Sequence, residues 1–288
     1  MSGSSLEDKN AVIPGAGHAA PPPVEAATTH RADRSGLRDK AELLRALHVP
    51  GAPLVLPNAW DVGSARAVVE AGFPVVATAS NAIAAALGHD DGEGAPIGDM
   101  MFVARRIAAS VAVPVTVDAE AGYGMAPEEL VQLLVGIGAA GCNIEDSDHV
   151  NGGLVDVDVR AAYLARMREA AGRIGVPLVV NARIDSFFPT SPLPGDRRRA
   201  DAIRRAGAYL AAGADCVFPA GAGPEDLRAI VAEAGGPVNA GLALGRGSLD
   251  ELRAIGVARV SVGPQLYRGA LDHLRTALRP LLQEVSEP

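Results

Sequence analysis

The sequence predicts an α/β protein whose fold is a (β/α)8 TIM barrel. Short apolar segments alternate with longer stretches at helical spacing from residue 37 onward, and this unit occurs eight times. Glycine-containing turns, such as those at 70–73 and 138–141, link the helical stretches to the next apolar segment. An open, doubly wound sheet is the alternative arrangement of the same elements. The spacing of roughly 25 to 40 residues between units favours the closed barrel.

Eight apolar segments are predicted to be the barrel strands, because each is short and bounded by turn residues. They span 54–57, 75–78, 115–118, 142–145, 178–181, 216–219, 238–240 and 259–262. Helices are predicted where apolar residues recur at helical spacing, at 63–71, 99–110, 127–137, 159–173, 197–212, 224–233, 248–255 and 264–282. The link at 80–99 is predicted to be a loop, whose acidic segment 89–93 lies across the mouth of the barrel.

Residues 1–34 are predicted to be a disordered tail, because Ser, Gly, Ala and Pro dominate there and no hydrophobic periodicity is present. Residues 35–288 are predicted to form a single barrel domain. Apolar residues make up 48% of the chain but aromatic residues only 3%, so the core must consist of Ala, Val, Leu and Ile. Cys142 and Cys216 lie inside apolar strand segments and are predicted to be buried thiols.

Charge and hydropathy disfavour several kinds of partner. A formal net charge of −8 and a pI near 5.3 argue against nucleic-acid binding, which needs clustered Lys and Arg. The one basic cluster, at 197–199 with Arg204 and Arg205, is predicted to be the solvated face of a helix. The chain contains no apolar run of about 18 residues and no secretory signal pattern, so we expect a cytoplasmic protein that does not contact membranes.

Acidic residues gather where the third and fourth predicted strands end. Asp118 and Glu120 follow one strand, and Glu145 and Asp146 end the next. In a barrel the carboxyl ends of the strands form one face, so these carboxylates should converge. They would repel one another unless a cation lies among them, and oxygen ligands suit a hard divalent ion. The sequence therefore predicts a site for Mg²⁺, with Mn²⁺ as an alternative, held by Asp118, Glu120 and Glu145.

A single arginine, Arg183, follows the fifth strand on the opposite side of the predicted site. Its planar guanidinium could clamp a carboxylate or phosphonate, or it could pair structurally with Asp185 or Glu145. A metal on one side and an arginine on the other fit a substrate with an anionic group beside a keto or enolate oxygen. Such a site favours reactions that stabilise an enolate.

These motifs together resemble the isocitrate lyase/phosphoenolpyruvate mutase superfamily over residues 50–270. They are Asp118-Ala-Glu-Ala-Gly-Tyr-Gly, Asn-Ile-Glu145-Asp, Asn-Ala-Arg183-Ile-Asp185 and the upstream Ala-Ala-Leu-Gly-His-Asp-Asp91. The resemblance implies a magnesium-dependent barrel that exchanges its last helix with a neighbour, as a homotetramer (a dimer of dimers) or a homodimer. It also implies small 2-oxo or 2-hydroxy acid substrates, such as phosphonopyruvate, oxaloacetate or 2-hydroxy tricarboxylates.

The resemblance also implies roles for individual residues. Asp118 would contact the metal directly, with Glu120 and Glu145 holding it through water, and Arg183 would bind the substrate carboxylate. Asp91 would place a catalytic acid near the reacting end of the substrate. The remaining substrate-binding positions are the backbone turn Thr78, Ala79 and Ser80, and Asn239 at the end of the seventh strand.

The chain departs from the isocitrate-cleaving members in the loop after the fourth strand. Those enzymes carry Lys-Lys-Cys-Gly-His there, whereas this chain has Asp146-Ser-Asp-His149-Val-Asn-Gly-Gly and no cysteine. Ala220 also stands where they carry a glutamate after the sixth strand. Both departures disfavour isocitrate-type cleavage. His149 could act as a general acid, because its pKa suits that task, or it could be a surface-loop histidine.

Two classes of function follow from these observations. The first is an enzyme that cleaves or rearranges a C–C or P–C bond through an enolate-like intermediate: a lyase, an oxaloacetate-type hydrolase or decarboxylase, or a phosphonomutase. The second is a barrel that binds anions as a scaffold without turnover. Mutually repelling charges have no use in a scaffold, so the sequence favours the enzyme.

Overall fold

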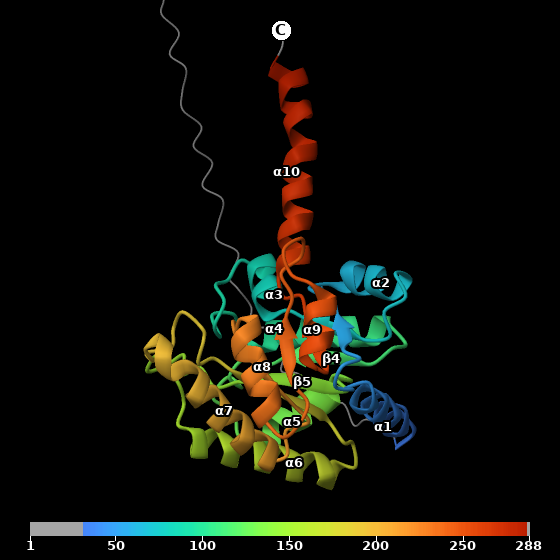
Figure 1. The fold of residues 1–288 in the computed structure, drawn as a ribbon. Coiled ribbons are helices and arrows are strands. Elements are labelled where there is room, and N and C mark those ends of the chain that lie inside the picture. Colours follow the sequence, from blue (N-terminus) through green and yellow to red (C-terminus); the bar gives the residue numbers. More distant parts are fainter. Residues whose placement is uncertain (1–30, 287–288) are drawn as a thin grey trace, which may run out of the picture.

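The computed structural model describes residues 31–286, in which parallel strands are surrounded by helices (Figure 1). The strands are β1 Leu54–Leu56, β2 Asn58–Ala59, β3 Val76–Thr78, β4 Val115–Asp118, β5 Gly141–Glu145, β6 Val179–Ile184, β7 Cys216–Pro219, β8 Asn239–Gly241 and β9 Arg259–Ser261. The helices are α1 Arg31–Ala46, α2 Val62–Glu70, α3 Ser80–Leu87, α4 Ile97–Ser110, α5 Pro127–Gly136, α6 Val157–Ile174, α7 Gly195–Ala211, α8 Pro224–Glu233, α9 Leu249–Ile255 and α10 Gln265–Ser286.

The strands form a closed, all-parallel ring. Six of them pair in the order β2-β3-β4-β5-β6-β7, and the other three pair as β1-β9-β8. A parallel bridge between Val217 and Val238 joins β7 to β8. β1 and β2 are two parts of one barrel strand, interrupted at Pro57, which has no N–H to donate to a ladder. The predicted (β/α)8 barrel is therefore confirmed.

The link at 80–99 differs from its prediction as a loop, because its first part is the helix α3. Half of this segment, Ser-Asn-Ala-Ile-Ala-Ala-Ala-Leu, is alanine and it has no polar face, so helical periodicity could not reveal it. Alanine has the highest helix propensity, which accounts for the structure that forms. The helix ends at Gly88, whose φ of 85° is the left-handed conformation that glycine adopts most readily.

The first helix, α1, covers the amino-terminal ends of the barrel strands. It begins at Arg31, so its first turn falls inside the segment 1–34 that was predicted as a tail; residues 1–30 lie outside the described part of the chain. Leu44 packs so closely against Gly141 that a Cβ on that glycine would lie 2.8 Å from the leucine side chain. Arg45 pairs with Asp215 at 2.7 Å. Together these contacts close the end of the barrel formed by the amino-terminal ends of the strands.

His48, directly after α1, is buried, and its Nδ1 donates to the Leu44 carbonyl oxygen at 2.8 Å. Burial and the nearby charge of Arg259 lower the pKa of His48 from 6.5 to about 4. Between these two pH values the unfolded chain takes up a proton that the folded protein does not, so acidification destabilises the fold. We expect this group to remove about 3 kcal/mol from the free energy of unfolding between pH 6.5 and 4.

The variant His48→Gln tests this expectation. Glutamine can still donate to the Leu44 carbonyl but does not titrate. Urea unfolding from pH 7 to pH 4 should show a shallower loss of stability for the variant than for the wild type. Parallel curves for the two proteins would mean that His48 is protonated in the fold.

The last helix, α10, extends away from the barrel (Figure 1). The ring of Tyr267, in its first turn, meets Trp60 at a centroid distance of 5.3 Å. Further along the helix, Leu274, Leu278 and Leu281 are each more than half exposed. Among residues 31–286, no helix combines the length and hydropathy needed to cross a membrane.

Candidate active site

A cavity of about 350 Å³ opens at the carboxyl ends of the barrel strands. Loops that follow several strands line it, as the fold predicts for a catalytic site. Five of the predicted site residues contribute to its wall: Ala79, Ser80, Asp91, Asp118 and Arg183. Asn58, which follows the first predicted strand, and Asn143, inside the fourth, also line the cavity. The predicted site thus contains a real cavity, with carboxylates and an arginine facing it.

Asp118, the last residue of β4, is held by one carboxylate oxygen and leaves the other available. Oδ2 accepts hydrogen bonds from the Ser80 hydroxyl at 2.8 Å and the Ser80 backbone N–H at 3.2 Å. The Asp118 backbone N–H donates to Oγ1 of Thr78 at 2.8 Å. Oδ1 is buried and has no hydrogen-bond partner among residues 31–286. A buried carboxylate oxygen in this state fits a single direct bond to a cation.

Glu120 lies beside Asp118 on a backbone turn with unusual geometry. Glu120, Tyr123 and Glu93 have φ values of 48°, 54° and 62°, in the left-handed region that non-glycine residues rarely adopt. Glu120 accepts hydrogen bonds from the Tyr123 hydroxyl at 2.5 Å and from the Glu93 backbone N–H. The Tyr123 N–H donates in turn to Glu93 Oε1 at 2.6 Å. These bonds tie the acidic loop to the end of β4 and account for the strained turn.

The charge of Glu120 is disfavoured by its surroundings. Burial raises the pKa of Glu120 to about 7, and the neighbouring carboxylates of Asp118 and Asp91 add to the effect. Burial and Asp118 likewise raise the pKa of Asp91. A cluster in which Asp118 disfavours the ionisation of two neighbouring carboxylates marks a place where a cation would relieve repulsion.

Glu145 and Arg183, on the neighbouring strands β5 and β6, form the centre of a second network. Glu145 binds Arg183 Nη1 at 2.5 Å through one oxygen and His149 Nε2 at 2.7 Å through the other. Arg183 also donates from Nε and Nη2 to the two oxygens of Asp185, at 2.7 and 3.0 Å. Its guanidinium carbon lies 4.5 Å from the centroid of the Phe188 ring. Three of the five guanidinium N–H groups are therefore used, and two remain for a ligand.

The network also shifts the titration of its members. Burial alone would lower the pKa of Arg183, but Glu145 and Asp185 outweigh it and raise that pKa. Burial raises the pKa of Glu145. The hydrogen bond to Glu145 raises the pKa of His149, which favours the imidazolium form. Arg183 is thus paired structurally with Glu145 and Asp185, which is one of the two predicted alternatives, and it also lines the cavity.

Thr78 and Asn239 are placed behind the cavity wall and do not line it. Thr78 fixes the backbone of Asp118, as described above. Asn239 is fully buried and donates from Nδ2 to the hydroxyl of Ser261 at 3.1 Å. Ser261 itself lines the cavity. Both residues are thus positioned to hold groups of the cavity wall in place.

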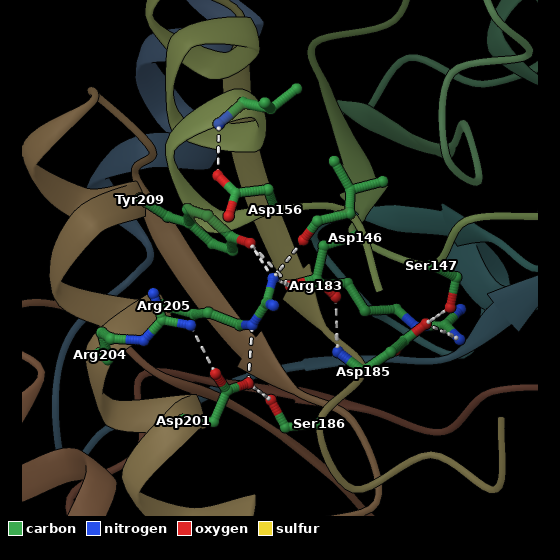
Figure 2. Close-up of polar contacts among 12 residues, drawn as sticks. Asp146, Ser147, Asp156, Arg183, Asp185, Ser186, Asp201, Arg204, Arg205 and Tyr209 are labelled. Carbon is green, nitrogen blue, oxygen red and sulfur yellow. Dashed lines mark hydrogen bonds and ion pairs between the residues drawn. The ribbon is translucent and has the colours of Figure 1, made fainter. Parts of the chain in front are cut away.

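Arg205 was predicted to lie on a solvated face, and that prediction is wrong: the residue is buried, at 6% exposure of its side chain. Figure 2 shows its guanidinium among Asp146, Asp201 and Tyr209, all of which it contacts. Its Nη1 donates to Oδ2 of Asp146 at 2.9 Å, and the Tyr209 hydroxyl donates to the same oxygen at 2.7 Å. The other oxygen of Asp146 accepts the backbone N–H of Asp185 at 2.9 Å. Arg205 therefore supports the segment that orients Arg183.

Among residues 31–286, no three His, Cys, Asp or Glu side chains converge as a preformed metal cluster. Both oxygens of Glu120 accept protein hydrogen bonds, and those of Glu145 contact His149 and Arg183. Within the same range, Oδ1 of Asp118 has no hydrogen-bond partner. This donor set fits a cation that keeps much of its water shell, as Mg²⁺ does, with one direct carboxylate and the others acting through water.

Comparisons with known proteins identify relatives of this chain. A family model described as phosphoenolpyruvate phosphomutase matches residues 44–282. An uncharacterised protein of Mycobacterium tuberculosis is 35% identical over 229 residues, covering 78% of this chain and 83% of the relative. An oxaloacetate decarboxylase of Rhodopseudomonas palustris is 34% identical over 205 residues, 68% of each chain. A Burkholderia cenocepacia crystal structure assigned as a phosphonomutase superposes with a TM-score of 0.79 and 43% identity, covering 84% of this chain and 99% of the other.

Proposed function

Because this chain belongs to the isocitrate lyase/phosphoenolpyruvate mutase superfamily of lyases and mutases, we propose that it acts on a small 2-oxo or 2-hydroxy carboxylate through an enolate-like intermediate. The observation that carries the proposal is that Asp118 and Arg183 line one cavity. Within residues 31–286, Oδ1 of Asp118 has no hydrogen-bond partner, and the contacts described above use three of the five N–H groups of Arg183. The Asp118 oxygen suits a cation, and Arg183 suits a carboxylate.

In this proposal Asp118 holds Mg²⁺ directly, while Glu120 and Glu145 hold it through water. The ion, when bound, polarises the substrate oxygen that becomes the enolate oxygen. Mn²⁺ could replace it, because both are hard cations that accept oxygen ligands.

Arg183 and the start of α3 bind the anionic end of the substrate. Arg183 offers two N–H groups, stacked on Phe188 so that the guanidinium plane is fixed. On the other side of the cavity, Ala79, Ser80 and Asn81 form its wall where α3 begins, and helix N-termini favour negative charge. The cavity volume of about 350 Å³ matches a small acid and lies at the low end for ligand sites.

Two groups are placed to move a proton. Asp91 lines the cavity, and burial together with the charge of Asp118 raises its pKa, which favours the protonated form. His149 lies outside the cavity wall, hydrogen-bonded to Glu145 and within 3.2 Å of the space that a Cβ on Gly92 would fill. We propose Asp91 as the acid that meets substrate, with His149 setting the charge of Glu145.

The absence of a cysteine from the loop at 146–153 shifts the expected substrate away from isocitrate-like acids. Ala220 lines the cavity with no acidic group of its own. Substrates whose departing enolate needs no strong acid therefore fit best, namely oxaloacetate-type acids or a phosphonate. The oxaloacetate decarboxylase relative is consistent with the first of these.

Thermal unfolding with and without Mg²⁺ tests the proposal across oxalate, pyruvate, oxaloacetate, phosphonopyruvate and 2-methylisocitrate. A ligand of the folded state raises the melting temperature by mass action. We expect a magnesium-dependent rise with oxalate, which resembles enolpyruvate in shape and charge, and with at least one of the 2-oxo acids. No rise with any acid would contradict the proposal and favour a scaffold or a substrate outside this chemistry.

We further propose that the exposed leucines of α10 pack on a second copy of this chain, as expected if this helix is exchanged within a homodimer or homotetramer. Leu274, Leu278 and Leu281 recur at helical spacing and so form one stripe. The variant Leu278→Asp should lower the mass measured by light scattering to half or less. Thr276→Asp adds the same charge on the opposite face of α10 and should keep the wild-type mass. An equal mass for all three proteins would contradict this assembly.

A further inference from the structure

Asn143 lines the cavity from β5, the strand between β4, which carries Asp118, and β6, which carries Arg183. In the barrel register it stands beside Asp118 of β4 on one side and Asn181 of β6 on the other. It lines the cavity together with Asp118 and Arg183. Its side chain is therefore close to any substrate that bridges these two groups.

The orientation of the Asn143 amide is fixed by two hydrogen bonds to its oxygen. Its Oδ1 accepts hydrogen bonds from Asn181 Nδ2 at 2.9 Å and from Arg259 Nη2 at 3.0 Å. Arg259 belongs to β9, which does not neighbour β5, so this second bond crosses the interior of the barrel. A pair of asparagines alone could bond with either polarity. Because a guanidinium can only donate, Arg259 selects the polarity in which Oδ1 of Asn143 faces Arg259.

The amide nitrogen of Asn143 consequently points away from Arg259. Nδ2 makes no hydrogen bond to any residue in the described part of the chain, although both bonds to Oδ1 are made. An amide N–H₂ that adjoins a cavity between a metal-binding carboxylate and an arginine is a ready donor for an anionic oxygen.

We propose that Asn143 donates a hydrogen bond from Nδ2 to the carboxylate or enolate oxygen of the substrate, and that Arg259 is the positioning residue that holds the amide in this orientation. The inference rests on the proposed function, because it takes an anionic acid as the ligand. It assigns to this acid a neutral donor in addition to the charged groups already described.

Within the part of the chain that the structure describes, Arg259 has no carboxylate bonded to it, which sets it apart from Arg183 and Arg205. It is 1% exposed, and its Nε and Nη1 lack hydrogen-bond partners among residues 31–286. Burial lowers the pKa of Arg259 to about 10, so the side chain remains charged at neutral pH. A buried charge without a counterion is costly to the fold, and the cost is reduced when an anion binds above it.

Calorimetric titration with oxalate at saturating Mg²⁺ tests the inference on the wild type, Asn143→Ala, Arg259→Met, Arg259→Lys and the Asn143→Ala/Arg259→Met double variant. Loss of a hydrogen bond to a charged group should weaken binding in Asn143→Ala about 10-fold. Arg259→Met should weaken binding about 2-fold or more, because half of the amides would face the wrong way. Lysine also only donates, so Arg259→Lys should bind within about 2-fold of the wild type.

Two further readouts separate positioning from a structural role. The double variant should bind no more weakly than Asn143→Ala, because Arg259 would act through an amide that is no longer there. Arg259→Met should keep or raise the melting temperature, since it removes an unpaired buried charge. Wild-type affinity in Asn143→Ala would overturn the inference about Asn143 and leave the proposed function standing. Failure of the wild type to bind oxalate would overturn the proposed function and the inference with it.

Discussion

Replacing Asp118 by asparagine is expected to abolish magnesium-dependent binding of oxalate and to lower turnover of the physiological acid by roughly 1,000-fold, which corresponds to about 4 kcal/mol of transition-state stabilisation. The substituted amide would keep the size of the side chain and an oxygen to accept the Ser80 hydroxyl. It would not supply the anionic oxygen that stands unbonded in the wild type, within residues 31–286. Calorimetry with oxalate, and an assay of consumption of the acid that raises the melting temperature of the wild type, would measure the two effects.

The matched control for this variant is Asp90→Asn, which removes one negative charge from the exposed part of the acidic loop. A general effect of net charge would appear in both variants, whereas loss of a metal ligand would appear only in Asp118→Asn. The fold should tolerate the latter, since mutual repulsion with Glu120 falls. Unfolding at room temperature would show that Asp118 is a structural residue, and unchanged oxalate binding would place the metal elsewhere.

The sequence predicted the barrel because each strand–helix unit carries its own local signals. Apolar strands, glycine turns and helical periodicity all repeat within a few tens of residues, and none depends on contacts between distant units. The helix α3 was not predicted, because it lacks this local periodicity. Its alanines give a high propensity but no periodic pattern, and the acidic segment that follows is typical of a loop.

The cavity residues also differ in whether a local sequence pattern predicts them. Asp118 and Arg183 end strands and could be placed from the pattern alone, and the structure puts both in the cavity wall. Asn143 and Arg259 lie 116 residues apart, and their contact exists only once the ring of strands is closed. No local pattern distinguishes a buried arginine on a short strand from one at its exposed end. Such inward-facing polar pairs could be found only from the barrel register.

Arg205 shows that the arginines of one basic cluster can differ in burial. Asp201, Arg205 and Tyr209 recur at i, i+4 and i+8, which places them on one face of α7, and Ala202 and Ala206 lie beside them in the core. This periodicity was present in the sequence but was outweighed by the number of neighbouring arginines. Arg204, the adjacent residue, is exposed as predicted.

The variant Arg205→Met is expected to lower the free energy of unfolding by about 3–5 kcal/mol, the largest stability effect predicted for a single side chain of this protein. Asp146 is fully buried, and Arg205 is the cation that compensates its charge. Methionine would fill most of the arginine volume, so the loss would come from the uncompensated carboxylate and not from a cavity. Urea unfolding at pH 7 would measure the change.

A second substitution separates charge from packing. In Arg205→Met/Asp146→Asn the buried carboxylate becomes a neutral amide whose oxygen can still accept the backbone N–H of Asp185. This double variant should recover most of the lost stability. Arg204→Met, which removes an exposed arginine from the same helix, should change stability by no more than about 0.5 kcal/mol. If the single and double Arg205 variants were equally unstable, packing of the arginine stem would be the dominant contribution of Arg205, and its ion pair with Asp146 would be dispensable.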